Sequence, residues 1–246
     1  MNLETANFYR KLAGIYDELF PVEASTMQFL NEAGARPGRP VLDLACGSGL
    51  YTEALLREGV DAYGLDASPD LIERARARSS HPERFVLADM REIGSVTAPL
   101  PPLFDLVFCI GNSISHLDSA AEVRSVLGSV AGILDGPDAR VVIQYVEMEE
   151  ISVGSARDLP ALRAGGGRFE RRYVRTESHR ITFEAALVDE NTDDRDAIKN
   201  ELLVLRTAEL VDWLGEFGFG SVEVWGGFER QPIEDSWVRV VAATPG

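Results

Sequence analysis

One stretch of this sequence constrains the fold more than any other, because an apolar run ends there in a glycine-rich turn. Residues 41–45 (VLDLA) lead into residues 46–49 (CGSG), a helical pattern follows over 50–58, and a second apolar run ends at Asp66. Glycines let the backbone come close to a ligand, and a carboxylate at the end of the second run can grip a ribose diol. The pattern therefore predicts a strand–turn–helix–strand unit that holds a nucleotide.

The alternation of strands and helices continues along the chain. Strands are predicted at 40–45, 61–65, 84–88, 104–110 and 140–146, and helices at 50–58, 69–78 and 120–134. This order is typical of an α/β, Rossmann-like, doubly wound and mostly parallel sheet that is covered on both faces. Ligands of such sheets bind beyond the carboxyl ends of the strands, where Cys46, Asp66, Asp89 and Gly111 fall.

The rhythm changes after Glu150. Residues 169–175, 181–188 and 200–205 alternate apolar and polar side chains, which predicts antiparallel strands, and the acidic residues 189–196 are expected to form a loop. A helix at 207–217 and two antiparallel strands at 221–228 and 236–243 would complete a seven-stranded sheet with an antiparallel final strand.

These patterns predict three regions. Residues 1–36 carry helical spacing over 3–20 and 22–33 and form an N-terminal helical lid. Residues 37–150 and 206–246 form the ligand-binding core. Residues 151–205 form an antiparallel β insertion, either a cap over the substrate or a dimer surface.

Composition argues against several partner classes. The net charge of −16 would repel a nucleic acid, so a small molecule is the expected partner. Neither a secretory signal nor a membrane-spanning run is visible, and two cysteines with three histidines have no metal-binding spacing, so we expect a cytoplasmic protein without a metal. The sequence leaves the oligomeric state open, a homo-oligomer included.

Together these motifs resemble the class I S-adenosylmethionine-dependent methyltransferases over about residues 35–245. Residues 43–49 (DLACGSG) match their glycine motif, Asp66 matches the acid that ends their second strand, and residues 88–90 (ADM) resemble their adenine corner. The resemblance implies S-adenosyl-L-methionine as cofactor. Its implied contacts are Asp43, Ala45, Cys46, Gly47, Gly49, Asp66, Ala67, Asp89, Met90, Ile110 and His116. The structural alternative for Asp66 and Asp89 is a helix cap or a surface carboxylate.

A second resemblance concerns the methyl acceptor. Residues 108–117 (FCIGNSISHL) resemble the fourth-strand motif of glycine and glycine/sarcosine N-methyltransferases, which implies that Asn112 faces the acceptor and that His116 lies beside the cofactor. Tyr16, in a Tyr-Asp pair before the core, resembles a lid tyrosine of small-molecule methyltransferases, and Tyr9 is the second choice. The candidate catalytic residues are thus His116, Asn112 and Tyr16. Their structural alternatives are a satisfied histidine, a turn residue and core packing.

The predicted activity is methyl transfer to a small molecule, with an amine placed ahead of a hydroxyl group. A hydroxyl acceptor would want a base, for which His116 and Glu147 are the candidates. The arginine that follows strand five in glycine N-methyltransferases is missing, and Arg157, Arg172 and Arg175 are offered as substitutes. A nicotinamide-dependent oxidoreductase fits poorly because the turn has no third glycine, and a non-catalytic cofactor-binding protein is the third option.

Overall fold

The computed structural model describes residues 12, 14–97, 99–192 and 194–246, and the chain divides into two compact units. The larger unit consists of Val22–Glu147 and Leu205–Gly246. The smaller unit consists of Met148–Val204 together with the described residues up to Pro21. Tyr9 and most of the first predicted helix lie outside the described residues.

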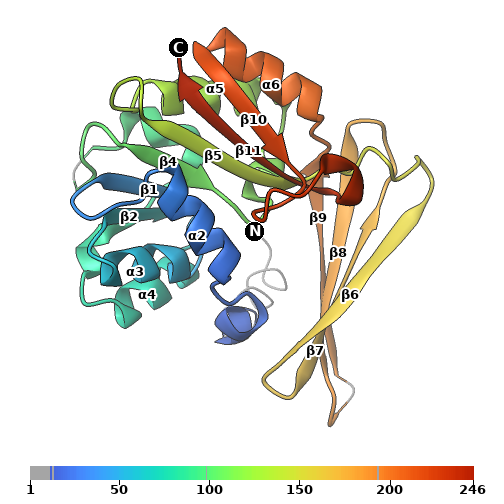
Figure 1. Ribbon diagram of the computed structural model, residues 1–246. Helices are drawn as coiled ribbons and strands as arrows, with labels where there is room; N and C mark the ends of the chain where they lie inside the picture. Colours follow the sequence, from blue (N-terminus) through green and yellow to red (C-terminus); the bar gives the residue numbers. More distant parts are fainter. Residues whose placement is uncertain (1–11, 13, 98, 193) are drawn as a thin grey trace. The chain divides into compact units, whose positions relative to one another are not determined.

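The larger unit is built on a seven-stranded sheet with the strand order β10-β11-β5-β4-β1-β2-β3 (Figure 1). The strands are β1 (Pro40–Leu44), β2 (Asp61–Asp66), β3 (Phe85–Leu87), β4 (Leu106–Cys109), β5 (Arg140–Val146), β10 (Phe219–Trp225) and β11 (Val238–Pro245). The pairings among β1 to β5 are parallel, whereas β11 is antiparallel to both β5 and β10. The predicted fold class, with its antiparallel final strand, is confirmed.

Both faces of this sheet are covered. Val107 and Phe108 are consecutive residues of β4, point to opposite faces, and are both fully buried. The helices of this unit are α2 (Ala24–Ala33), α3 (Leu50–Arg57), α4 (Pro69–Arg78), α5 (Ala120–Ala131) and α6 (Thr207–Glu216). Helix α4 begins as predicted, because Ser68 caps it and Pro69 is its first residue.

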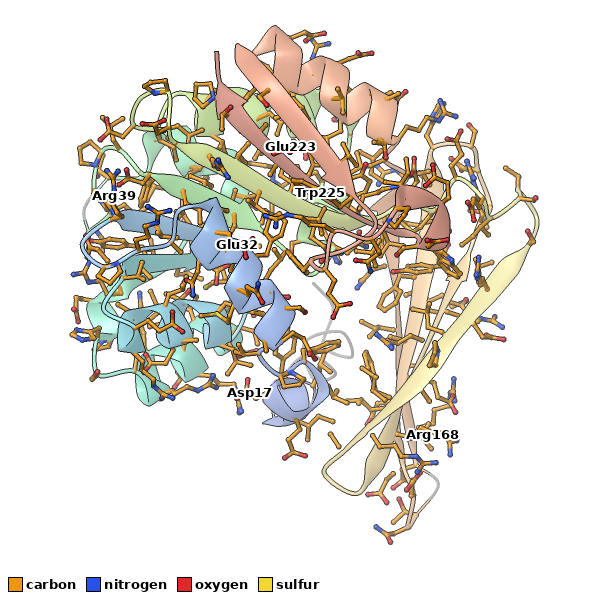
Figure 2. The ribbon with its side chains drawn as sticks, in the orientation of Figure 1. Asp17, Glu32, Arg39, Arg168, Glu223 and Trp225 are labelled. Carbon is orange, nitrogen blue, oxygen red and sulfur yellow. The ribbon has the colours of Figure 1, made fainter. Side chains whose placement is uncertain are left out.

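An aromatic cluster fastens α2 to the end of β10. Phe29 of α2 packs edge-on against Trp225, with ring centroids 5.5 Å apart, and Figure 2 labels Trp225 and the nearby Glu32 of α2. Arg230 lies over both rings and forms a 2.7 Å ion pair with Glu32. This contact ties the first described helix of the unit to its last strands.

The smaller unit is a four-stranded antiparallel sheet formed by β6 (Ala156–Ala164), β7 (Gly167–Val174), β8 (Arg180–Asp189) and β9 (Arg195–Leu203). Phe169, Ala185 and Ile198 on one face pack against Leu19 and the half-buried Tyr16 of the N-terminal helical segment. On the other face, Glu170 and Glu184 are each paired with two cationic side chains. The sheet therefore has one apolar face and one charged face.

Two expectations for this unit are corrected. Strand β6 was not predicted, because most of its side chains are exposed and Pro160 with a register shift interrupts its pairing. Strand β9 begins at Arg195, inside the residues expected to form an acidic loop, because Arg195 and Asp196 pair with Val188 and Leu187 of β8. The loop itself is shorter than predicted.

Among the described residues, no helix combines the length and the apolar character needed to cross a bilayer.

Candidate functional site

The glycine-rich turn after β1 has a left-handed backbone at three positions. Ala45, Gly47 and Gly49 have φ angles of 66°, 59° and 76°. The Ala45 and Cys46 amides both donate to the Leu65 carbonyl, at 2.7 and 3.0 Å, so the turn is anchored to β2. Helix α3 begins directly after Gly49, and the first N–H groups of a helix favour an anion. The start of α3, next to the turn, thus presents backbone donors at the carboxyl edge of the sheet.

Two glycines at this edge are required by packing. A Cβ on Gly49 would lie 2.4 Å from the Phe85 ring and 2.9 Å from the Ala75 side chain. A Cβ on Gly64 of β2 would lie 2.8 Å from the Cys46 sulfur. Both contacts are too short for a side chain, so these glycines bring β2, β3 and the turn together.

Asp66, at the end of β2, faces the glycine turn. Its Oδ2 accepts a 2.8 Å hydrogen bond from the Gly47 amide, and its Oδ1 accepts one of 2.8 Å from the Ser68 amide. Burial raises the pKa of this carboxyl, and the backbone N–H groups of Ser68 and Gly47 oppose the rise. A carboxylate oxygen has two lone pairs, so Asp66 can accept further hydrogen bonds from ligand hydroxyl groups.

Asp43 lies deeper, within β1, and is only 2% exposed. Its Oδ2 accepts a 2.9 Å hydrogen bond from the Thr52 hydroxyl. Burial raises the pKa of this carboxyl to about 7, and the nearby Asp66 charge adds to the rise. Asp43 is therefore close to its titration point at neutral pH.

The two cysteines at this edge, Cys46 and Cys109, have unreactive thiols. Burial raises the pKa of Cys46 well above its ordinary value and that of Cys109 to about 12. Both thiols are protonated at neutral pH, and a thiol is a much weaker nucleophile than a thiolate. Among the described residues, no cluster of three or more His, Cys, Asp and Glu side chains is arranged to hold a metal ion.

Asp89 follows β3 and caps the short 3-10 helix η2 (Met90–Ser95). It accepts hydrogen bonds from the backbone and side chain of Arg91, which lowers the pKa of the Asp89 carboxyl. Met90 is half-buried, and Ala67 after β2 is exposed. The cap predicted as the structural alternative is present, and it leaves lone pairs of Asp89 available.

The loop after β4 is held to β5 by two side-chain amides. The Gly111 amide donates to Gln144 Oε1 at 2.7 Å, and Asn112 Oδ1 accepts from the Val146 amide at 2.9 Å. Gly111 and Asn112 both have left-handed backbones, with φ angles of 75° and 63°. The Ser115 hydroxyl also donates to Asn112 Oδ1, at 2.9 Å. Asn112 therefore fixes the conformation of this loop and its position against β5.

His116 ends the short 3-10 helix η3 (Ser113–His116) in the same loop. Part of its side chain is exposed, yet desolvation by the atoms packed around the ring lowers the pKa of the imidazole. The ring is therefore neutral at pH 7 and has one nitrogen that can accept a proton. Ile110, at the start of the loop, is half-buried.

Glu147, the other candidate base, is committed to neighbouring groups. Its Oε2 lies 2.6 Å from Arg239 Nε and accepts a 3.0 Å hydrogen bond from the Thr207 hydroxyl, while its Oε1 accepts one from the Thr207 amide. An ion pair and two hydrogen bonds stabilise the carboxylate. This arrangement argues against Glu147 as a general base.

The structure also shows the contacts of the candidate arginines and of Tyr16 in the smaller unit. Arg175 is buried and donates to five backbone carbonyl groups, and Arg172 pairs with Glu184 at 2.6 Å. Arg157 is exposed. The Tyr16 ring lies 4.9 Å from the Phe20 ring in the apolar cluster, so core packing is what the structure shows for it.

Sequence reasoning missed Gln144 and Arg239. Gln144 is a buried amide in the otherwise apolar run 141–146, and that isolated polar residue was a usable signal. Arg239 lies on β11 opposite Tyr145, and its pairing with Glu147 depends on a contact between strands far apart in the chain. No local pattern could have revealed it.

Comparison with known proteins agrees with this geometry. Residues 41–135 match the family described as "Methyltransferase domain". The glycine/sarcosine N-methyltransferase of Parasynechococcus marenigrum is 23% identical over 205 residues, which cover 83% of this chain and 70% of the relative. A glycine/sarcosine/dimethylglycine N-methyltransferase of Actinopolyspora halophila is 25% identical over 211 residues, which cover 84% of this chain but 36% of that relative. A ubiquinone biosynthesis O-methyltransferase of Methylococcus capsulatus is 31% identical over 105 residues, covering 43% of this chain and 44% of the relative.

Solved structures share the fold over nearly the whole chain. An S-adenosylmethionine-dependent methyltransferase from Clostridium acetobutylicum has a TM-score of 0.76 at 16% identity, covering 98% of this chain and all of its own. Streptomyces venezuelae DesVI has a TM-score of 0.71 at 20% identity and is covered completely in both directions.

The sheet and the matched domain define a class I methyltransferase. This chain is an S-adenosylmethionine-dependent methyltransferase, and S-adenosyl-L-methionine is its methyl donor. The oxidoreductase and the non-catalytic binding protein are thereby set aside.

Proposed function

We propose that the enzyme methylates a nitrogen atom of a small amine. The observation that carries this proposal is the state of Glu147, which is neutralised by Arg239 and hydrogen-bonded to Thr207. A neutral amine has a lone pair and needs no base, whereas a hydroxyl acceptor must lose a proton during transfer. Two curated relatives named as N-methyltransferases of glycine and sarcosine support the same direction.

The residues at the carboxyl edge fit the cofactor. Gly49 and Gly64 let the turn pack closely against β2 and β3, and Asp66 has lone pairs for two ribose hydroxyls. In this proposal the turn formed by Ala45, Cys46, Gly47 and Gly49 holds the methionine part, with Asp43 available for its ammonium group. Asp89 and the Met90 backbone hold the adenine, Ala67 flanks the ribose, and Ile110 and His116 border the cofactor.

The bound cofactor supplies an activated methyl group, and the protein's own residues supply alignment and exclude water. Left-handed Gly111 and Asn112 fix the acceptor-side loop, so that the acceptor's lone pair can be held in line with the methyl group. His116, with its neutral ring, can accept the proton that the methylated nitrogen releases. Tyr16 as a lid residue stays a prediction.

Calorimetry with S-adenosylhomocysteine tests the cofactor assignment. Replacing Asp66 with Asn or Ala should weaken binding by about 1.5–3 kcal/mol, the usual scale for hydrogen bonds to a charged group. Asp212→Asn, on the exposed surface of α6, is the matched control and should bind normally. Unchanged affinity in both Asp66 variants would show that Asp66 is misassigned.

A hydroxyl acceptor is the second candidate, because the neutral and partly exposed His116 could serve as its base. The pH dependence of turnover separates the two. With an amine, kcat/KM should follow the pKa of the amine and change from one amine to the next. A profile that ignores the acceptor and collapses in His116→Gln would favour the hydroxyl group.

A further inference from the structure

Two side-chain amides link the loop after β4 to β5, because each accepts a hydrogen bond from a backbone N–H of the other segment. Gln144 of β5 accepts a hydrogen bond from Gly111 in the loop, at 2.7 Å. Asn112 of the loop accepts one from Val146 of β5, at 2.9 Å. Both residues are 9% exposed. These reciprocal bonds fix which end of each amide is the oxygen, because only a carbonyl oxygen can accept from a backbone N–H.

The amino groups of the same two amides take no part in these bonds. Among the residues that the structure describes, neither Asn112 Nδ2 nor Gln144 Nε2 has a hydrogen-bond partner, and both retain contact with solvent. Each amino group carries two donors and no acceptor. The two amide oxygens hold the loop against β5. The two amino groups are hydrogen-bond donors, and their orientation is fixed by the bonds that the oxygens make.

The position of these donors points to a ligand. They lie where β4 and β5 end, and ligands of open parallel sheets bind beyond those ends. An almost buried donor without a partner loses free energy unless a ligand or water satisfies it. Donor groups bind an oxygen that accepts hydrogen bonds and discriminate against an ammonium group, which also has only donors.

We propose that the amino groups of Asn112 and Gln144 form a two-donor subsite for a hydrogen-bond-accepting oxygen of the methyl acceptor. The acceptor is then an amine that also carries a carboxylate or a carbonyl group. The subsite uses neutral donors, whereas Arg239, the buried cation beside β5, is occupied by Glu147. The inference rests on the proposed amine methylation and adds a specificity-determining residue, Gln144, to it.

The substitution Gln144→Glu separates recognition from loop support. A glutamate oxygen can still accept from the Gly111 amide, but a second oxygen replaces the donor and repels a carboxylate. Gln28→Glu is the matched control, because Gln28 lies on α2 and, within the described part of the chain, its exposed amide bonds only to Glu32.

The first experiment observes the amides directly, in wild-type protein saturated with S-adenosylhomocysteine. The side-chain NH2 resonances of Asn112 and Gln144, assigned by their loss in Asn112→Asp and Gln144→Glu, are followed by NMR. Acetate tests the carboxylate and acetamide the carbonyl. Acetate, acetamide or both should shift the Asn112 and the Gln144 resonances, whereas methylammonium should shift neither resonance. The side-chain resonance of Gln28 should not move with any of these compounds. If both resonances ignore acetate and acetamide alike, the subsite does not exist.

The second experiment is kinetic. With amines that carry a carboxylate, Gln144→Glu should raise KM by about tenfold or more and change kcat less, while affinity for S-adenosylhomocysteine stays as in Gln28→Glu. Equal losses with simple alkylamines, or loss of cofactor affinity, would mean that Gln144 only supports the loop. Absence of methyl transfer to every amine would instead overturn the proposed function. The NMR experiment would then still decide whether the two-donor subsite exists.

Discussion

Asp43 is a buried carboxyl group whose titration near neutral pH affects the stability of the fold. Its pKa is about 7 in the folded protein and 3.8 in the reference state, because burial disfavours the carboxylate. Between these values the folded state binds more protons than the unfolded state. The contribution of Asp43 to stability is therefore fully present below about pH 4 and is lost as the pH rises through about 7.

Replacing Asp43 with Asn should remove this dependence. The amide oxygen can still accept from Thr52, so the fold keeps that hydrogen bond. Urea denaturation at a series of pH values should show that wild-type stability relative to Asp43→Asn falls between about pH 4 and about pH 7. Asp212→Asn on the surface of α6 should run parallel to wild type. A constant difference between wild type and Asp43→Asn would contradict the raised pKa.

At the scale of elements, the end of β5 is tied to β11 and α6 by Glu147, Arg239 and Thr207. The Glu147 side chain is 15% exposed and that of Arg239 is 9% exposed. Arg239→Met should leave an uncompensated carboxylate and cost about 3–5 kcal/mol, the usual scale for removing one partner of a buried pair. The double variant Glu147→Gln, Arg239→Met should recover most of this loss in urea denaturation.

Glu147→Gln alone should keep methyl transfer, because the proposed chemistry does not use this carboxylate. Two outcomes would contradict the argument. One is a double variant no more stable than Arg239→Met, and the other is loss of turnover in a folded Glu147→Gln enzyme whose cofactor affinity is normal.

The elements differ in how far local sequence could predict them. Strand β5 and helix α4 were predicted to the residue, since a mostly apolar run and a Ser-Pro cap are local signals. Strand β6 was missed because its exposed face carries no apolar period. The predicted closeness of the glycine turn and Asp66 needed only the rule that parallel strands end at one edge, and the structure places Gly47 and Asp66 in contact.

The acceptor side was less predictable for a physical reason. Gln144, Asn112 and Arg239 acquire their roles from hydrogen bonds and ion pairs between separate strands, and those partners follow from register. The motif at 108–117 located the loop, whereas the orientation of its amide groups required coordinates. Sequence could therefore indicate a methyl-transfer site, but not which oxygen or amino group points where.

At the scale of the whole molecule, the two units have separate hydrogen-bonded sheets and separate apolar clusters. All proposed cofactor residues belong to the larger unit. A ligand stabilises the folded state that binds it, by about 2.7 kcal/mol at a hundredfold excess over its Kd. Cofactor binding should therefore protect the larger unit more than the smaller one.

Hydrogen exchange with and without S-adenosylhomocysteine measures this difference. At a hundredfold excess over Kd, amides of β1 and β4 that exchange by unfolding of the larger unit should slow by about a hundredfold. Amides of β7 and β8 should slow much less, because their ladder is closed within the smaller unit. Asp66→Asn at the same ligand concentration should lose most of the protection of β1 and β4. Equal slowing in β7 and β8 would mean that the two compact units open in one cooperative step, which would contradict the expected difference in protection.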